Sequence, residues 1–225
     1  MTTISVIYHS PRETTHGQAQ AVVEGARAVH GVTVHAIRID KAQIKDGHWH
    51  DADALEKLNA SDGIIFGSVT YFGMVSGPFK LFLDSTFGLW AQQAWKDKFA
   101  GGFTNSAAYN GDKQVTLMQL LTYAAQMAMI WVPMGDHPGA NWSGASQEDI
   151  NRTGSFLGPM AQTNSDADAT PGSDLATARR YGQRFAEIVR HWKREGDYAT
   201  ERYFDKATIA AVRKRGLAGV PERVA

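Results

Sequence analysis

The sequence contains no cysteine, and this absence excludes disulfides, catalytic thiolates and cysteine-held metal clusters. It also lacks any run of about eighteen apolar residues, the length that a membrane-spanning helix requires. The first residues lead into a β-rich segment without the basic stretch that opens a secretory signal peptide. We therefore expect a cytoplasmic protein that has no membrane partner.

A net charge of one sign is lacking as well. Lys and Arg together number 23, and so do Asp and Glu, which makes the formal net charge zero. A neutral chain is not expected to bind nucleic acids through a broad positive field. With 43% hydrophobic and 20% charged residues, the 225-residue chain has the composition of a globular protein with a sizeable core.

Segments of strand and helix character alternate along the first part of the chain. Strands are expected at 4–8, 32–39, 62–67, 99–104 and 129–132, and helices at 18–29, at 53–59, from Pro78 onward and at 115–127. This alternation predicts a doubly wound α/β fold, in which a five-stranded parallel sheet carries helices on both faces.

The pattern changes after the fifth predicted strand. Residues 133–173 are rich in Gly, Asn, Ser, Asp and Pro, and about forty residues without an evident element indicate a lid, an interface or a mobile segment. An amphipathic helix follows at 174–195. We predict one domain over residues 1–196, with the irregular stretch as an insertion. A C-terminal extension over 197–225 would contain a short helix, capped by Asp205 and ending at Gly216.

The most informative segment is 67–90. It follows a buried-looking strand, contains Tyr71 and Phe72 in a short loop, and enters a helix near Pro78. This arrangement places the two rings at the carboxyl edge of the sheet, where doubly wound proteins bind ligands. Two further loops, 10–17 and 103–111, follow strands in the same way. The first combines hydroxyls with the amides of a helix N-terminus, which suits a phosphate group.

These loops carry a resemblance to a known family. Gly67-x-x-Thr70-x-Phe72-Gly73, then Gly77, then Phe82-Leu83-Asp84-x-Thr86-x-Gly88-Leu89-Trp90, resembles the FMN-contacting loop and following helix of the WrbA family. Members of that family are flavodoxin-fold NAD(P)H:quinone oxidoreductases. The resemblance extends from Ser10 to Gly25 and, more loosely, from Phe103 to Val132.

The resemblance implies the topology, the cofactors and the partners. It implies that residues 1–196 form a flavodoxin-like FMN-binding domain with strand order 2-1-3-4-5. FMN would be the bound cofactor, NADH or NADPH the electron donor, and a small quinone-type molecule the acceptor. The flavin would carry the chemistry, so no catalytic side chain and no metal is expected. A homodimer or homotetramer is also implied, and it agrees with aromatic residues outside the predicted sheet that a neighbouring subunit could cover, namely Trp142, Phe156, Tyr198, Tyr203 and Phe204.

The site residues are implied in the same way. Trp90 matches the tryptophan that lines the quinone side of the family's pocket, and Gln126 with Met127 stands where the family places a histidine near the flavin. We therefore take Trp90 and Gln126 as substrate-binding candidates. The candidates for FMN binding are Ser10, Arg12, Thr14, Thr15, Val69, Thr70, Tyr71, Phe72, Gly73, Asn105, Ser106, Ala107, Ala108 and Tyr109.

The chain departs from the family pattern in two of the three loops. Glu13 replaces a glycine of the phosphate loop, and a carboxylate about 4 Å from a phosphate costs roughly 1–4 kcal/mol. We therefore expect Glu13 to point to solvent or to pair with Arg12. In the third loop, Ala107, Ala108 and Tyr109 replace a glycine-rich sequence and narrow the backbone freedom, with Tyr109 as a cover over the flavin edge.

Several alternatives stay open on the sequence alone. The hydroxyls of loop 10–17 could simply cap a helix, an aromatic of 70–73 could plug the sheet edge, and Trp90 could be a core residue. For the whole protein, the alternatives are an electron-transfer flavodoxin and a non-enzymatic scaffold with a degenerate flavin site. A phosphoacceptor receiver domain is not expected, because Ser10-Pro11-Arg12 stands where its acidic pair would be. The run His48-Trp49-His50-Asp51 matches no standard zinc spacing.

Overall fold

A parallel sheet forms the centre of the protein, whose computed structural model describes residues 1–194. The sheet consists of β1 (Thr2–His9), β2 (Val32–Arg38), β5 (Gly63–Tyr71), β7 (Phe99–Ser106) and β8 (Ile130–Trp131). Its order is β2-β1-β5-β7-β8, and each of these neighbouring pairs is parallel. This is the predicted order 2-1-3-4-5, so the doubly wound α/β prediction is confirmed.

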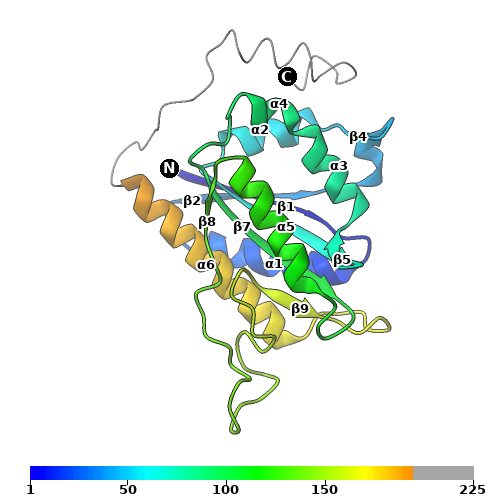
Figure 1. Cartoon of the computed structure of the whole chain (residues 1–225). Helices are drawn as coiled ribbons and strands as arrows, with labels where there is room; N and C mark the ends of the chain where they lie inside the picture. The colour runs from blue at the N-terminus through cyan, green and yellow to red at the C-terminus, as the bar shows by residue number, and fades with distance from the viewer. Residues whose placement is uncertain (195–225) are drawn as a thin grey trace.

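Helices cover both faces of the sheet, as Figure 1 shows. On one face, α1 (Glu13–Arg27) and α6 (Gly172–Arg194) bury a cluster that includes Val22 and Phe185. On the other face lie α2 (Ala52–Ala60), α3 (Gly77–Ser85), α4 (Phe87–Ala91) and α5 (Lys113–Gln126). The predicted C-terminal extension, including the helix expected between Asp205 and Gly216, lies outside the described residues.

The two helices α1 and α6 approach each other closely. A Cβ atom at Gly25 of α1 would collide with the backbone carbonyl of Arg179, and one at Gly182 of α6 would collide with that of Val22. The backbones can therefore touch only because both positions are glycine. This contact fixes the last described helix against the sheet.

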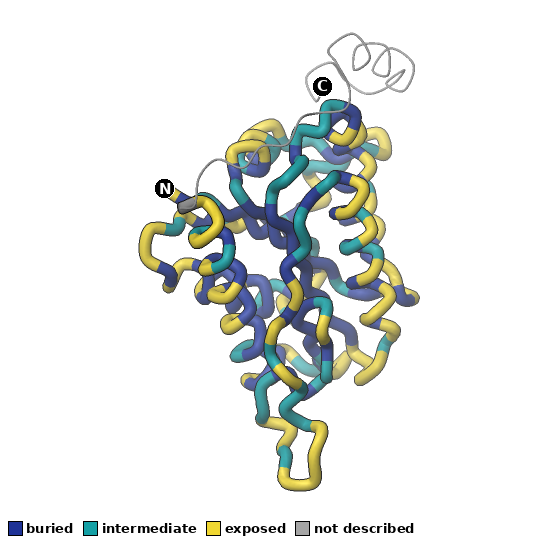
Figure 2. The backbone as a smooth tube through the Cα atoms, turned by 60° about the vertical axis from the view of Figure 1, so that its left-hand side comes forward, coloured by how far each residue is buried: buried dark blue, intermediate teal, exposed yellow. Residues whose placement is uncertain are grey.

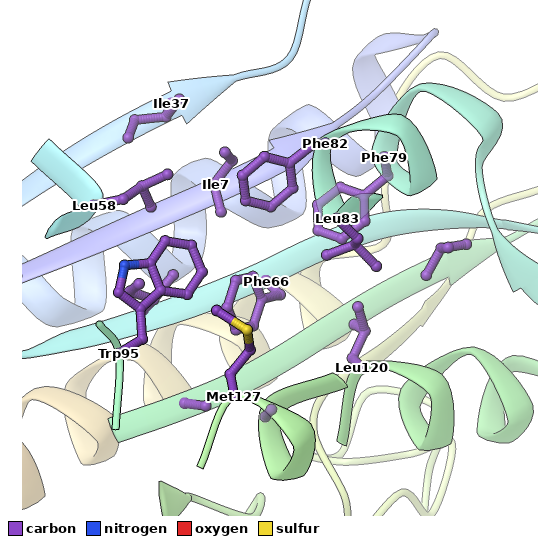
Figure 3. Close-up of a cluster of buried hydrophobic side chains, with 14 of the residues drawn as sticks. Ile7, Ile37, Leu58, Phe66, Phe79, Phe82, Leu83, Trp95, Leu120 and Met127 are labelled. Carbon is purple, nitrogen blue, oxygen red and sulfur yellow. The ribbon is translucent and has the colours of Figure 1, made fainter. Parts of the chain in front are cut away.

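The core of the second face is aromatic. Figure 3 shows Phe66, Phe79, Phe82 and Trp95 packed together between the strands and the helices, and all four side chains are fully buried. Phe79 and Phe82 meet edge to face with ring centroids 5.5 Å apart, a favourable geometry for aromatic pairs. In Figure 2 the strands are mostly dark blue, whereas the outer faces of the helices are yellow. No helix within residues 1–194 is long and apolar enough to cross a membrane.

The stretch 133–173 contains one element that the sequence did not predict. Strand β9 (Met160–Gln162) pairs in parallel with Thr104–Ser106 of β7, whereas β8 pairs with Phe99 and Ala100 of the same strand. The fifth position of the sheet is thus divided between two short strands. The expectation of a stretch without any element is therefore wrong at these three residues, which are too few to produce a visible hydrophobic period.

Four short elements complete the described part of the fold. A 3-10 turn η1 (Lys41–Gln43) leads into the small hairpin of β3 (Ile44–Lys45) and β4 (His48–Trp49). Strand β6 (Met74–Val75) folds back antiparallel on β5. That last hairpin lies at the carboxyl end of β5, where the sequence places the aromatic loop.

Candidate functional site

The three predicted loops meet at one edge of the sheet. They follow β1, β5 and β7, which are adjacent strands, and the register pairs His9 with Ser68 and Val69 with Asn105 near the strand ends. The carboxyl ends of parallel strands point the same way, so the loops lie side by side. The structure therefore brings the predicted FMN-binding residues to one region.

The first loop ends in an open helix N-terminus. Helix α1 begins at Glu13, five residues earlier than the predicted start, so Thr14 and Thr15 lie in its first turn. Within the described residues, the N-cap position Arg12 makes no side-chain cap hydrogen bond. Ser10 is buried, and its Oγ accepts a bond of 2.9 Å from the His16 amide and donates to the Arg12 carbonyl. Ser10 thus caps one amide of the first turn, as the helix-capping alternative expects for this hydroxyl. The amides of Glu13, Thr14 and Thr15 have no acceptor within the described residues and remain available to an anion.

Glu13 pairs with a residue that sequence reasoning did not select. Its carboxylate, 65% exposed, accepts two hydrogen bonds of 3.1 Å from the guanidinium of Arg38, which also donates to the Ser10 carbonyl at 2.9 Å. Of the two expected alternatives for Glu13, exposure to solvent is the one found. Arg12 donates to the carbonyl of Ser165 instead of pairing with Glu13. Arg38 ends β2, the parallel neighbour of β1, and this register was the available signal for it.

The second loop is a tight hairpin turn between β5 and β6. Its two central residues, Phe72 and Gly73, both have positive φ, 51° and 71°, as a type I′ turn requires. The Phe72 side chain is 99% exposed and that of Tyr71 is 48% exposed. A phenylalanine in the left-handed region is strained. Its ring is nevertheless held out in solvent at the ligand-binding edge.

Thr70, a predicted FMN-binding residue, uses its hydroxyl inside the protein. The Oγ1 atom lies 2.7 Å from Thr104 Oγ1 and 2.8 Å from Thr116 Oγ1, and all three residues are buried. These bonds join the ends of β5 and β7 to helix α5. Only the backbone of Thr70 is therefore left to meet a ligand. Val69 beside it is half-buried.

The third loop packs against the insertion. The Asn105 side chain donates to Thr163 Oγ1 at 3.0 Å, and the Tyr109 hydroxyl donates to the carbonyl of Arg152 at 3.1 Å. Ala107, Ala108 and Tyr109 are exposed, whereas Ser106 is buried. The insertion therefore packs against the inner side of this loop and leaves its outer surface exposed to solvent.

A buried ion pair anchors the insertion. Arg152 Nε and Nη2 donate to the two carboxylate oxygens of Asp174 at 2.8 and 2.7 Å, and both side chains are buried. The hydrogen bonds that Arg152 donates to the Asp174 carboxylate raise the pKa of the guanidinium. Asp174 also accepts the amide of Gln162, so one carboxylate joins α6, β9 and the insertion. Such a two-point pair fixes orientation as well as distance.

Lys113 is a second residue that sequence reasoning missed. It opens α5 directly below the third loop, its side chain is buried, and burial lowers its pKa to about 8. The Nζ atom donates to Ser106, Ala108 and Tyr109. No sequence signal separates this lysine from an ordinary exposed one at a helix N-terminus.

A groove of about 840 Å³ lies beside these loops, between α3 and α4 on one side and α5 on the other. Both predicted substrate-binding residues, Trp90 and Gln126, line it. Trp90 is 40% exposed and stacks at a tilt on Phe87, with centroids 5.3 Å apart, so the alternative of a core tryptophan is wrong. Other lining residues are Met74, Phe87, Met118 and Tyr123. None of the FMN-binding candidates lines the groove, although Met74 directly follows Gly73.

The fold and its edge define a class of protein. The sheet has the strand order of flavodoxin-like α/β proteins. An open helix N-terminus and exposed aromatics on adjacent loops at its edge are typical of a nucleotide-binding site in this class. The family described as NADPH-dependent FMN reductase matches residues 2–138. The chain belongs to this family.

Individual relatives agree with this membership. The flavodoxin FldP of Pseudomonas aeruginosa is 41% identical over 81% of this chain and 94% of its own. The NAD(P)H dehydrogenase (quinone) of Bradyrhizobium diazoefficiens is 32% identical over 84% of this chain and 98% of its own. The crystal structure of a WrbA-like flavodoxin from Agrobacterium tumefaciens superposes with a TM-score of 0.63 at 37% identity, over 85% of this chain and 99% of that one. The predicted WrbA-like, flavodoxin-fold family is thus confirmed.

Proposed function

We propose that the protein holds FMN at the three loops and passes electrons from NADH or NADPH to a quinone or similar acceptor. The family match and the quinone-dehydrogenase relative support this activity. The observation that carries the proposal is the convergence of the loops after β1, β5 and β7, with open amides at one end and exposed rings at the other. A planar ring with a phosphate tether is the ligand that this combination fits.

The phosphate end of FMN is assigned to the first loop. The first turn of α1 offers the amides of Glu13, Thr14 and Thr15 to an anion, together with the hydroxyl of the half-buried Thr14. Arg38 neutralises the Glu13 carboxylate, which would otherwise repel the phosphate. Ser10 holds the loop in shape from within.

The ring end is assigned to the second and third loops. The exposed rings of Tyr71 and Phe72 suit contact with a flat aromatic molecule, and Gly73 lets the turn close. The open outer surface of residues 107–109 offers backbone donors to ring oxygen and nitrogen atoms. When bound, FMN would supply the hydride and electron chemistry. The protein side chains would position it and exclude water, so no acid or base is assigned.

The acceptor is assigned to the groove next to the ring end. Trp90 and Gln126 line it together, one as an aromatic wall and the other as a hydrogen-bonding side chain. The apolar lining favours a hydrophobic acceptor such as a quinone. Donor and acceptor would use the site in turn.

We further propose a homodimer or homotetramer in the cytoplasm, where NAD(P)H is available. Phe72, Met74, Phe87, Trp90 and Met118 are all large, apolar and exposed around the groove. A surface of this kind favours cover by a second copy. Light scattering of the purified protein at micromolar concentration should give at least twice the chain mass of 24.6 kDa, and a monomer would contradict this part of the proposal.

Flavin binding and turnover form the central experiment. Apoprotein is titrated with FMN while flavin fluorescence is followed, and the loaded protein is then assayed with NADH or NADPH and a soluble quinone. Saturable FMN binding with quinone-dependent oxidation of the nicotinamide is expected. A protein that takes up no FMN would refute the proposal.

A one-electron carrier is the second candidate function, and the 41% identity to a protein named as a flavodoxin favours it. The two functions differ in one measurement. Steady NAD(P)H oxidation with a soluble quinone supports the enzyme, whereas an FMN-loaded protein that exchanges electrons only with a protein partner supports the carrier.

A further inference from the structure

The strongest unexplained feature of the described chain is the buried side chain of Lys113. Its Nζ atom donates to Ser106 Oγ at 2.9 Å, to the Ala108 carbonyl at 2.8 Å and to the Tyr109 carbonyl at 2.7 Å. All three hydrogens of the ammonium group are thus used on one loop, the one between β7 and α5. No carboxylate within residues 1–194 forms an ion pair with it, so its charge is held by neutral oxygens alone.

These bonds decide which way the loop amides face. The chain has no cis peptide bonds among its described residues, and in a trans peptide the N–H of one residue points opposite to the C=O of the residue before it. Because the carbonyls of Ala108 and Tyr109 point inward to Lys113, the amides of Tyr109 and Asn110 point outward. Within the described part of the chain these two amides have no hydrogen-bond acceptor, and both residues are exposed.

The loop would not keep this shape unaided. Gly111 and Asp112 both lie in the left-handed region, with φ of 56° and 53°. A Cβ atom at Gly111 would collide with the side chain of Ser106, so the turn requires glycine at this position. A non-glycine residue such as Asp112 pays a conformational penalty there. An interior group that binds two successive carbonyls is what offsets this strain.

We propose that Lys113 is a positioning residue that turns the Tyr109 and Asn110 amides outward as a pair of donors for the flavin ring. This inference rests on the proposed function and assigns a role to a residue that touches no flavin itself. The ligand chemistry is that of a planar ring edge with carbonyl oxygens and ring nitrogens as acceptors. The phosphate is not involved, because it is assigned to the loop after β1.

The test compares two flavins and two buried lysines. FMN and riboflavin, which has the same ring but no phosphate, are titrated into the apoprotein of the wild type, Lys113→Met and Lys98→Met. Lys98 is the matched control, since it is half-buried at the opposite end of β7 and donates to the carbonyls of Asn59 and Ser61. We expect Lys113→Met to lower the affinities for both flavins by the same factor, roughly tenfold. Lys98→Met should change neither affinity by more than about twofold.

Each other outcome overturns the inference. Equal binding by Lys113→Met and wild type removes any role for the lysine. Loss of FMN affinity alone would show that the lysine acts on the phosphate, and equal losses in the two variants would show a general effect of stability. If Lys113→Met does not fold by circular dichroism, Lys113→Gln, which keeps two N–H donors, replaces it with a smaller loss expected for both flavins. A wild type that binds neither flavin refutes the proposed function, and this inference with it, and is distinct from all these results.

Discussion

At the scale of single residues, the site depends on two charges that other parts of the fold compensate. Glu13 stands at the helix end where an anion should bind, and Arg38 from the next strand neutralises it. Lys113 lies below the third loop and donates its three hydrogen bonds to neutral oxygens. Glu13 and Arg38 are far apart in the sequence, so only the folded structure shows that their charges neutralise each other.

Removing Arg38 should expose the repulsion between Glu13 and a phosphate. We expect Arg38→Met to weaken FMN binding by roughly tenfold, in line with about 1.4 kcal/mol of unscreened charge repulsion at a partly exposed site. Riboflavin affinity should stay unchanged. The double variant Glu13→Gln with Arg38→Met should regain most of the FMN affinity, and a double variant as weak as the single one would show that the charge is not the cause. Fluorescence titration measures all three.

The lowered pKa of Lys113 predicts a pH dependence of stability. Burial lowers this pKa to about 8 from its ordinary value of 10.5, with the carboxylate of Asp174 raising it and the guanidinium of Arg152 lowering it. Between those two pH values the unfolded chain holds more protons than the folded one, so the free energy of unfolding contributed by this group rises with pH. The contribution is lowest below about pH 8.

Urea unfolding of the apoprotein at about pH 7.5 and 9.5 tests this dependence. The wild type should gain stability relative to Lys113→Met at the higher pH. Unfolding midpoints that shift in parallel for the two proteins would contradict the assignment. Flavin binding should change in the opposite direction, because a neutral amine keeps only two N–H donors for the three oxygens that Lys113 binds. The affinity of the wild type for FMN and for riboflavin should therefore fall alike as the pH rises through 8.

At the scale of elements, the main strands and helices were predictable because their hydrophobic patterns extend over many residues. The strand order came from the family resemblance and was confirmed. Strand β9 was missed because three residues show no period, and the start of α1 was placed late because no side-chain cap marks it. The sequence could not predict whether Trp90 is exposed, since an aromatic residue on a short helix shows the same pattern in a core and beside a groove.

The β5–β6 hairpin should show a conflict between stability and binding. Phe72 occupies a left-handed position that asparagine tolerates better. Phe72→Asn should therefore stabilise the apoprotein by about 0.5–1 kcal/mol, because less backbone strain is stored. It should weaken flavin binding about fivefold, because a ring contact is lost. Thermal melts and flavin titrations measure both, and a variant that is less stable and binds normally would contradict the assigned role.

At the scale of the whole molecule, one face combines the groove with several exposed apolar side chains, among them Met74, Trp90 and Met118. The groove lies between α3, α4 and α5, whereas α1 and α6 close the opposite face with a tight glycine contact. The molecule thus has one side covered by tightly packed helices and one open side that contains the groove. Assembly and acceptor binding are both assigned to the open side.

A charge in the groove should separate the subunits. Met118 on α5 lines it and is half exposed, so Met118→Lys should turn a dimer or tetramer into smaller species in light scattering while the circular dichroism stays unchanged. Ala125→Lys is the control, because Ala125 is exposed on the same helix and does not line the groove. Equal masses for the wild type and Met118→Lys would contradict the proposed interface.

The divided edge strand has a consequence for how the chain tolerates change. The polypeptide leaves the sheet after β8 and returns beside the same neighbour at β9, and its projecting arm closes again where the Gly139 amide donates to the Ile150 carbonyl at 2.9 Å (Figure 1). Residues 141–144 at its end are exposed. A peptide tag or a fluorescent reporter inserted there would be separated from the sheet by the hydrogen bond between Gly139 and Ile150. The insertion should therefore leave the strand order and the ligand-binding edge unchanged.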